Sequence, residues 1–282
     1  TLSLTILSRH ANTERVYGWK FAVEMGTGAV FVILMTQYVI ANFGFNGFIV
    51  GMALVYILLL LPLVKIPENF VRREDQQEAA REGSVWKSGA APWFAILALF
   101  TGAGIFYSMW AFMEKIGLRH GARPEFVETA IAITIVAGIA GAGLAGWIGN
   151  RWRQIGPLVV ILAGWVAATG LLSLNISGTA FLLGSCILMA LFMAWSAYQW
   201  AFICKVDTGG HVILWIPFAI TFSGIFGPSI GGLLIENFGY GMAFLCWVSA
   251  TASIIGLNVL AWALHFRNLQ RAPTKESLAE NA

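Results

Sequence analysis

Charged residues are scarce in this chain of 282 residues: only 11% are Asp, Glu, Lys or Arg, whereas 58% are hydrophobic. A soluble domain carries about 25% charged residues, so this chain lacks the polar groups that would cover a soluble surface. The same hydrophobicity excludes a disordered chain. The three cysteines, Cys186, Cys204 and Cys246, all lie inside apolar runs, which excludes a secreted disulfide scaffold. The composition therefore predicts an all-α protein that crosses a membrane several times.

Motifs for catalysis and for nucleic-acid binding are lacking as well. The four histidines are dispersed near the ends of apolar runs, and the sequence has no HExxH motif, paired CxxC motifs or phosphate-binding loop. We therefore expect no enzyme activity, no metal and no cofactor. The net charge of +3 comes from basic residues in short loops between apolar segments, so we expect no nucleic-acid partner.

Eight segments are long and apolar enough to cross a bilayer as helices, since a crossing takes about 20 residues. Their hydrophobic runs are continuous and do not alternate, which favours helices over barrel strands. The expected spans are Val16–Ile40, Gly47–Val64, Pro92–Met113, Val127–Gly149, Gly156–Leu174, Thr179–Cys204, Val212–Ile235 and Tyr240–His265. Glycine is abundant inside them and is densest over 138–149, which predicts close helix packing.

The Lys and Arg residues are distributed asymmetrically between the two ends of these spans. All of them except Lys115, Arg119 and Arg123 fall on one side, which predicts that both termini are cytoplasmic. We expect an integral protein of a bacterial inner (plasma) membrane. The polar stretch Pro67–Ala91 is expected to be a solvated cytoplasmic linker, with a regulatory binding site as the alternative.

A short internal repeat suggests that helices are duplicated. Asn42-Phe-Gly-Phe45 and Asn237-Phe-Gly-Tyr240 lie about 195 residues apart, each between two expected spans. The repeat unit is then six helices, so this chain would hold one complete six-helix bundle plus the last two helices of the other half. Thr1–Ser8 would be the end of a helix whose beginning is absent. The expected domains are 1–66 and 92–266 for the two halves, 67–91 for the linker and 267–282 for the tail.

Two glycine-containing motifs and this topology resemble the major facilitator superfamily of transporters. Gly146-Trp-Ile-Gly-Asn150-Arg151 is similar to the family's loop signature, with Asn150 where Asp is commoner and Arg153 where Gly is frequent. Gly224–Gly232, which contains Gly227 and Pro228, is similar to a Gly-Pro-x-x-Gly-Gly helix pattern of the family. A proline there would bend the helix. The resemblance implies gating roles for Gly146, Asn150, Arg151, Gly227 and Pro228.

The resemblance also implies that the segments 92–113 and 179–204 line a central cavity. Aromatic and hydrogen-bonding side chains share faces of these two segments at helical spacing, as suits an organic substrate. The substrate-binding candidates are Tyr107, Trp110, Trp195, Ser196 and Gln199. Packing or an interfacial position is the alternative for each aromatic residue, whereas hydrogen bonding between helices is expected of Gln37 and Asn258.

Glu24 is the one acid that lies well inside an expected span, which makes it the ion-coupling candidate. An interfacial pair with Lys20, one turn earlier, is the alternative. We expect secondary active or facilitative transport of a small organic solute by alternating access. If the transport is secondary active, we expect a proton or a sodium ion to be the coupling ion. The complete protein would be a monomer in the bilayer. A membrane-embedded receptor or assembly factor on the same scaffold is the alternative function.

Overall fold

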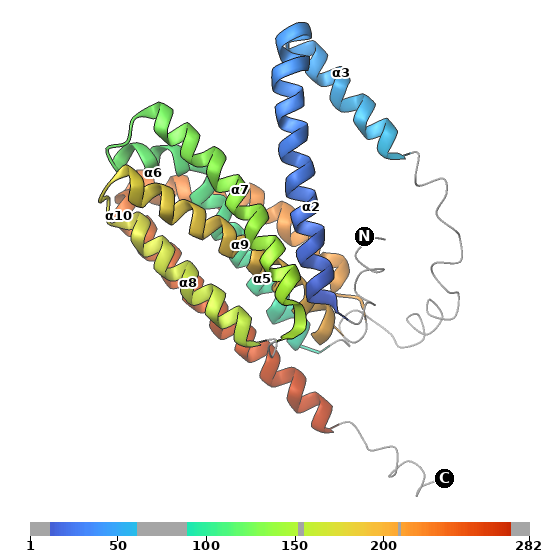
Figure 1. Cartoon of the computed structure of the whole chain (residues 1–282). Coiled ribbons are helices and arrows are strands. Elements are labelled where there is room, and N and C mark those ends of the chain that lie inside the picture. Colours follow the sequence, from blue (N-terminus) through green and yellow to red (C-terminus); the bar gives the residue numbers. More distant parts are fainter. Residues whose placement is uncertain (1–11, 61–88, 152–154, 208–209, 272–282) are drawn as a thin grey trace, which may run out of the picture. The chain divides into compact units, whose positions relative to one another are not determined.

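The computed structural model describes residues 12–60, 89–151, 155–207 and 210–271, and this part of the chain is helical with no strand (Figure 1). The all-α prediction is therefore confirmed. The described elements, in chain order, are α2 (Thr13–Leu34), η1 (Met35–Ile40), α3 (Ala41–Leu60), α5 (Ala91–Ala111), α6 (Met113–Arg119), α7 (Pro124–Ile148), η5 (Gly149–Arg151), α8 (Ile155–Ser173), α9 (Gly178–Val206), η6 (Ile213–Trp215) and α10 (Ile216–Arg271).

Six helical segments of the described chain are long and apolar enough to cross a membrane. They are Thr13–Val55, Ala91–Ala111, Pro124–Arg151, Ile155–Ser173, Gly178–Val206 and Ile213–Arg267. The expected count of eight is therefore not reached, because helix runs unbroken by a loop join the first two expected spans and the last two. Thr1–Ser8, the expected end of the second span at Val64, residues 67–88 of the linker and residues 272–282 of the tail lie outside the described residues. Residues 267–271, expected in the tail, continue α10.

The two long segments each contain one glycine whose backbone leaves the helical region. Gly44 has φ 63° and ψ −164°, and Gly239 has φ 76° and ψ 172°. Only glycine adopts this region readily, since a Cβ atom would clash there. The preceding asparagines also match: the amide of Asn42 donates to the Tyr38 carbonyl at 2.7 Å, and that of Asn237 donates to the Leu233 carbonyl at 2.8 Å. The repeat noticed in the sequence thus has one local structure at both places.

Helix α10 folds back on itself at Gly239. On the N-terminal side of Gly239, Gly231 packs against Ser108 of α5. On its C-terminal side, Trp247 donates a hydrogen bond from Nε1 to the same Ser108 hydroxyl at 3.0 Å. On a straight helix these two positions would be about 24 Å apart. Pro228 keeps helical backbone angles, so the break in α10 is at the glycine and not at the proline.

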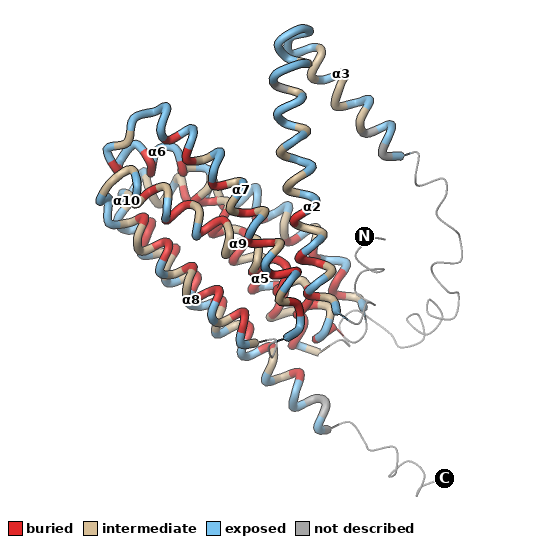
Figure 2. The backbone as a smooth tube through the Cα atoms, in the orientation of Figure 1, coloured by how far each residue is buried: buried red, intermediate tan, exposed pale blue. Residues whose placement is uncertain are grey.

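Packing divides the described chain into two units. The larger unit holds residues 12–22 and 89–271, and the smaller one holds residues 23–60. In the larger unit, α5 packs against α9 and α10, while α7 and α8 flank α9. Its core is built around large buried side chains, among them Tyr17, Trp165, Trp195 and Phe202. Buried residues follow the inner faces of these helices in Figure 2.

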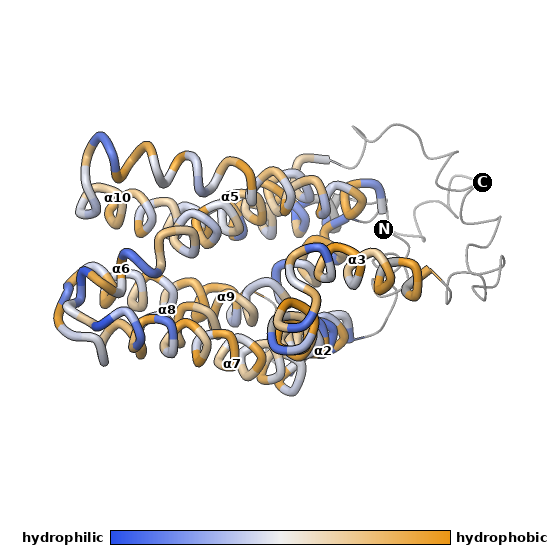
Figure 3. Tube along the Cα trace, turned by 90° about the horizontal axis from the view of Figure 1, so that it is seen from above, coloured by the Kyte–Doolittle hydropathy of each residue, from blue (hydrophilic) through white to orange (hydrophobic). Residues whose placement is uncertain are grey.

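Hydrophobic residues dominate the lengths of the helices in the larger unit, and hydrophilic residues gather in the turns at the helix ends (Figure 3). This is the distribution that a bilayer selects, with apolar shafts in hydrocarbon and polar connections in water. The helical segments are thus compatible with a membrane protein.

The smaller unit is a short helical hairpin around Gly44. A Cβ atom placed on Gly51 would lie 3.3 Å from the Met35 sulfur, so α3 returns past η1 after the turn. Its large apolar side chains are exposed, including Phe43 (72%) and Phe45 (70%) beside the turn. Such a surface needs lipid or further protein to cover it, because exposed apolar patches of this extent are rare on soluble monomers.

Candidate functional site

An aromatic cluster joins α5 and α9 at the centre of the larger unit. The rings of Phe106 and Phe192 stack with centroids 3.6 Å apart and planes within 3°. Trp195 lies one turn along α9 from Phe192, packs its ring against Gly102 and meets Trp165 edge-on at 5.5 Å. A larger residue at 102 would occupy the space of this indole ring. The two segments therefore pack directly against each other at this cluster.

Three of the five substrate-binding candidates meet at this cluster. Tyr107 is half-buried with its ring 6.3 Å from that of Phe192, and Trp110 is half-buried and stacked on Phe106 at 5.9 Å. Trp195 is fully buried, and its Nε1 has no hydrogen-bond partner among the described residues. Tyr107 and Trp110 thus form the accessible edge of the cluster, and Trp195 lies in its interior.

Gln199 and Ser196 bind protein groups inside the bundle. The amide nitrogen of Gln199 donates to the Ala95 carbonyl at 2.9 Å and to Oδ1 of Asn258 at 3.0 Å, which ties α9 to α5 and α10. The Gln199 carbonyl oxygen and the Asn258 amide nitrogen have no hydrogen-bond partner among the described residues. Ser196 donates to the Phe192 carbonyl of its own helix at 2.8 Å. The predicted interhelical role of Asn258 is confirmed.

Gly146 allows the start of α2 to lie directly against α7. A Cβ atom on Gly18 would collide with the Gly146 backbone, and one on Gly146 would meet the Trp19 backbone. Beyond this contact, Gly149 ends α7 with φ 52°, and its carbonyl accepts a hydrogen bond from the Tyr198 hydroxyl at 3.0 Å. The loop signature therefore does allow two helix ends to approach closely.

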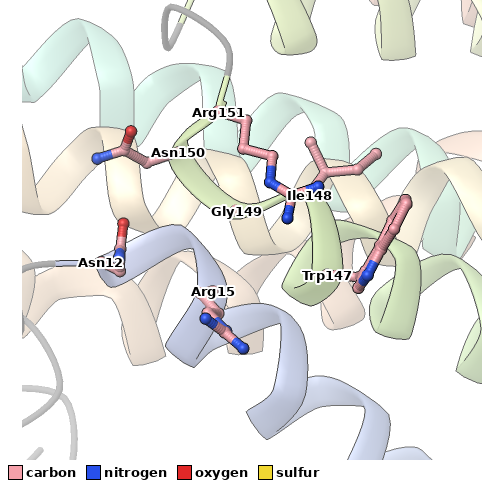
Figure 4. Close-up of a pocket in the computed structure, with 7 residues that line it drawn as sticks. All are labelled: Asn12, Arg15, Trp147, Ile148, Gly149, Asn150 and Arg151. Carbon is pink, nitrogen blue, oxygen red and sulfur yellow. The ribbon is translucent and has the colours of Figure 1, made fainter.

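The polar residues of this loop signature line an open cavity of about 300 Å³ (Figure 4). Asn150 is exposed, and the Arg151 guanidinium lies 5.2 Å from the ring centre of Trp147, one turn earlier in the chain. This contact holds the Arg151 guanidinium against its own chain segment. The cavity is lined by Asn12, Arg15, Trp147, Ile148, Gly149, Asn150 and Arg151.

A second cavity, of about 250 Å³, lies between α5 and the two arms of α10. Gly227 lies on its wall and packs against the Gly104 backbone, so this glycine allows α10 to approach α5. The few polar groups of the wall include Ser108 and Ser223, the latter donating to the Phe100 carbonyl at 2.8 Å. Neither serine was predicted from the sequence. The signal for Ser108 was its spacing from Thr101, because the two residues share one face of α5.

Two acidic residues of α2 have different surroundings. Glu24, the ion-coupling candidate, is exposed within the smaller unit. Glu14, in the first turn of α2, is only 2% exposed within the larger unit. The sequence prediction missed Glu14 because it began the first span at Val16. Lys20, the expected pairing partner of Glu24, has its ammonium 5.0 Å from the ring centre of Trp200.

Asp207 joins α9 to the helices that follow it. Its Oδ2 accepts hydrogen bonds from the backbone nitrogens of Val212 and Ile213 at 2.7 and 2.8 Å, so the side chain caps η6. Burial raises the pKa of this carboxyl above its ordinary value, and the two backbone hydrogen bonds oppose that rise. Residues 208 and 209, which follow Asp207, lie outside the described residues.

Within the described ranges, no group of three or more His, Cys, Asp or Glu side chains is arranged to hold a metal ion. No family model matches this sequence, and no curated protein matches it. The resemblance to the major facilitator superfamily therefore stays a prediction carried by its motifs, its repeat and its helices.

Proposed function

We propose that this chain is part of a secondary transporter of the major facilitator type, which moves a small organic solute across a membrane by alternating access. One observation carries the proposal: the two Asn-Phe-Gly turns share the same unusual glycine conformation and the same asparagine hydrogen bond. A local structure that recurs after about 195 residues supports a duplicated six-helix unit. Paired repeats of this size are a known transporter architecture.

The proposed topology has eight crossings. The segment through α2, η1 and α3 would cross twice with its turn at Gly44, and α10 would cross twice with its turn at Gly239. The arms Ile216–Phe238 and Tyr240–Arg271 each exceed the about 20 residues that a crossing needs. Together with α5, α7, α8 and α9 this gives one six-helix half plus two helices of the other, with both termini of the chain cytoplasmic.

The aromatic cluster is the proposed solute site. Tyr107 and Trp110 offer a half-buried aromatic edge, as a planar or apolar part of a solute would require. Gln199 would make a polar contact with the solute through its carbonyl oxygen, which has no hydrogen-bond partner among the described residues. Trp195 and Ser196, on the same helix, would form the wall of the site next to Gln199. Glu24 remains the proposed coupling carboxylate for a proton or sodium ion, because acids inside spans are costly and frequently functional.

The contact between Gly18 and Gly146 is the proposed gate. Two helices that meet through glycine backbones can separate and close again with little side-chain rearrangement. Arg15 and Gly149 lie just outside this contact, and a Cβ atom on Gly149 would be 3.3 Å from that of Arg15. This separation is close to the ~3.8 Å that a disulfide bond needs between Cβ atoms.

A disulfide across the gate tests the proposal. The complete polypeptide that contains this chain, with Cys186, Cys204 and Cys246 replaced by alanine, would carry Arg15→Cys and Gly149→Cys and be reconstituted in vesicles. The probe is a cell extract of small organic solutes, supplied with and without imposed proton or sodium gradients. Mass spectrometry would identify any solute that accumulates inside.

We expect the reduced double variant to accumulate at least one organic solute and the oxidised variant to lose this activity. Gly149→Cys alone is the control, since it carries the backbone strain at φ 52° without the crosslink. Transport that is equally fast before and after oxidation would overturn the gate. Absence of accumulation under every gradient would instead favour the receptor or assembly role.

A further inference from the structure

The cavity beside Gly149 has the composition of an anion site. Its wall carries two guanidinium groups, from Arg15 of α2 and from Arg151 after α7, and no carboxylate among the described residues that line it. Figure 4 shows the two arginines on different sides of the backbone at Gly149. Guanidinium groups match the geometry of phosphate oxygens, which they bind through paired hydrogen bonds.

The position of the cavity matches the depth of lipid headgroups. It lies where α7 ends at Ile148 and where α2 begins at Thr13, at the ends of two apolar helices. Trp147, on its wall, is 61% exposed, and tryptophan is enriched at the boundary between hydrocarbon and water. A phosphate held between the arginines would therefore be level with the headgroup layer.

An exposed apolar strip runs along α7 away from this cavity. Ile133 (45%), Val136 (63%), Leu144 (57%) and Trp147 share one face of the helix at helical spacing. The strip thus supplies a surface for hydrocarbon next to a pocket for phosphate. A free phosphate ester would use the pocket alone, whereas an anionic phospholipid would use both.

We infer that this cavity binds the phosphate group of an anionic phospholipid, with its acyl chains lying along the exposed face of α7. The asparagines Asn12 and Asn150 add amide groups for the glycerol and phosphate oxygens. The inference rests on the membrane location proposed above but not on transport. Basic pockets between membrane helices on the cytoplasmic side are suited to anionic headgroups.

Binding of short-chain lipids to the purified chain in a neutral detergent tests the site. Dioctanoyl phosphatidylglycerol is the probe, dioctanoyl phosphatidylcholine is the neutral lipid control, and glycerol phosphate is the headgroup without chains. We expect Arg15→Gln or Arg151→Gln to weaken phosphatidylglycerol binding about fivefold each, and the double variant about 30-fold. Arg15→Lys keeps the charge but not the paired hydrogen bonds, so it should weaken phosphatidylglycerol binding less than Arg15→Gln does.

Arg123→Gln is the matched control, because Arg123 is an exposed arginine at the opposite end of α7. It should leave phosphatidylglycerol binding unchanged. Phosphatidylglycerol binding that is unaffected by the double arginine variant, or no tighter than phosphatidylcholine binding, would overturn the site. Glycerol phosphate bound as tightly as phosphatidylglycerol would overturn the lipid assignment and indicate a soluble phosphate ester. A thermal unfolding curve for each variant keeps loss of binding distinct from loss of fold.

Discussion

Asp207 is the residue for which the structure predicts a specific pH dependence. The pKa of this carboxyl in the folded protein lies above the ordinary value of 3.8. Between pH 3.8 and that raised pKa, the folded protein therefore binds more protons than the unfolded chain. The free energy of unfolding should therefore fall as the pH rises through this window. Asp207→Asn should remove that slope, which thermal unfolding of both proteins across the window would measure. The same slope in both proteins would contradict the assignment.

The capping role of Asp207 gives a separate expectation at neutral pH. Asp207→Ala removes the acceptor for the Val212 and Ile213 backbone nitrogens and should lower stability by about 1–2 kcal/mol. Asp207→Asn keeps an oxygen acceptor and should cost less than the alanine variant. Equal losses in the two variants would show that the cap is not the stabilising feature.

Gly18 and Gly143 give a matched pair for the packing of α2 on α7. Gly18→Ala places a methyl group into the Gly146 backbone and should destabilise the protein by about 1–3 kcal/mol. Gly143→Ala lies on the same helix as Gly146 but meets nothing within 4 Å, so it should leave stability almost unchanged. Thermal unfolding in detergent would compare them. If both variants unfold like the parent protein, the close approach of α2 to α7 is wrong.

At the scale of helix pairs, the Gln199–Asn258 hydrogen bond links α9 to α10. Gln199→Leu removes the partner of a buried amide and should cost about 1–3 kcal/mol, because the Asn258 side chain is left unpaired. The double variant Gln199→Leu, Asn258→Leu should recover part of this loss, because no orphan amide remains. Unfolding free energies of the two single variants and the double variant give the coupling.

The same double variant separates a structural role of Gln199 from a solute-binding role. If Gln199 contacts the solute, the double variant should be folded and yet bind the solute roughly 5–150-fold more weakly, at 1.4 kcal/mol per tenfold change. Normal transport by a folded double variant would mean that Gln199 only packs the bundle. Trp110→Ala should reduce affinity through lost aromatic contact while leaving membrane insertion intact.

The hairpin turns give a prediction about single elements. Gly239→Ala forces a side chain into a backbone region that glycine alone adopts readily, at a cost of about 1–3 kcal/mol. Gly44→Ala should show the same effect in the smaller unit. Gly241→Ala is the control, because Gly241 is in the same helical segment with open space around it. A Gly239→Ala protein as stable as the Gly241→Ala protein would contradict the turn geometry.

At the scale of the whole molecule, the sequence predicted the features that are set by a few neighbouring residues and missed those that depend on contacts between distant segments. The helices followed from continuous apolar runs, and the turns followed from an asparagine and a glycine whose conformations are set within a few residues. The partners of Gln199 did not follow, because Ala95 lies on another helix far away in the chain. Glu14 was missed because its burial comes from packing against other helices, which an apolar window cannot register.

The count of crossings is the whole-molecule property that most needs measurement. If each long segment folds back across the bilayer, Gly44 and Gly239 both lie at the outer face, and Lys205 at the end of α9 lies at the cytoplasmic face. Single cysteines at Asn46, Gly241 and Lys205, in a background without the native cysteines, would report this with a membrane-impermeant maleimide. Intact cells should show labelling at positions 46 and 241 but not at 205.

Permeabilised cells supply the control for that experiment, because labelling at position 205 should then equal labelling at the other two. The six-segment interpretation makes a different prediction. An α10 that crossed the bilayer only once, with position 241 inside the hydrocarbon, would leave that position unlabelled, and position 46 in the segment containing Gly44 would behave likewise. Protection of position 46 or 241 in intact cells would therefore remove the eight-crossing topology, and with it the duplicated six-helix unit on which the transport proposal depends.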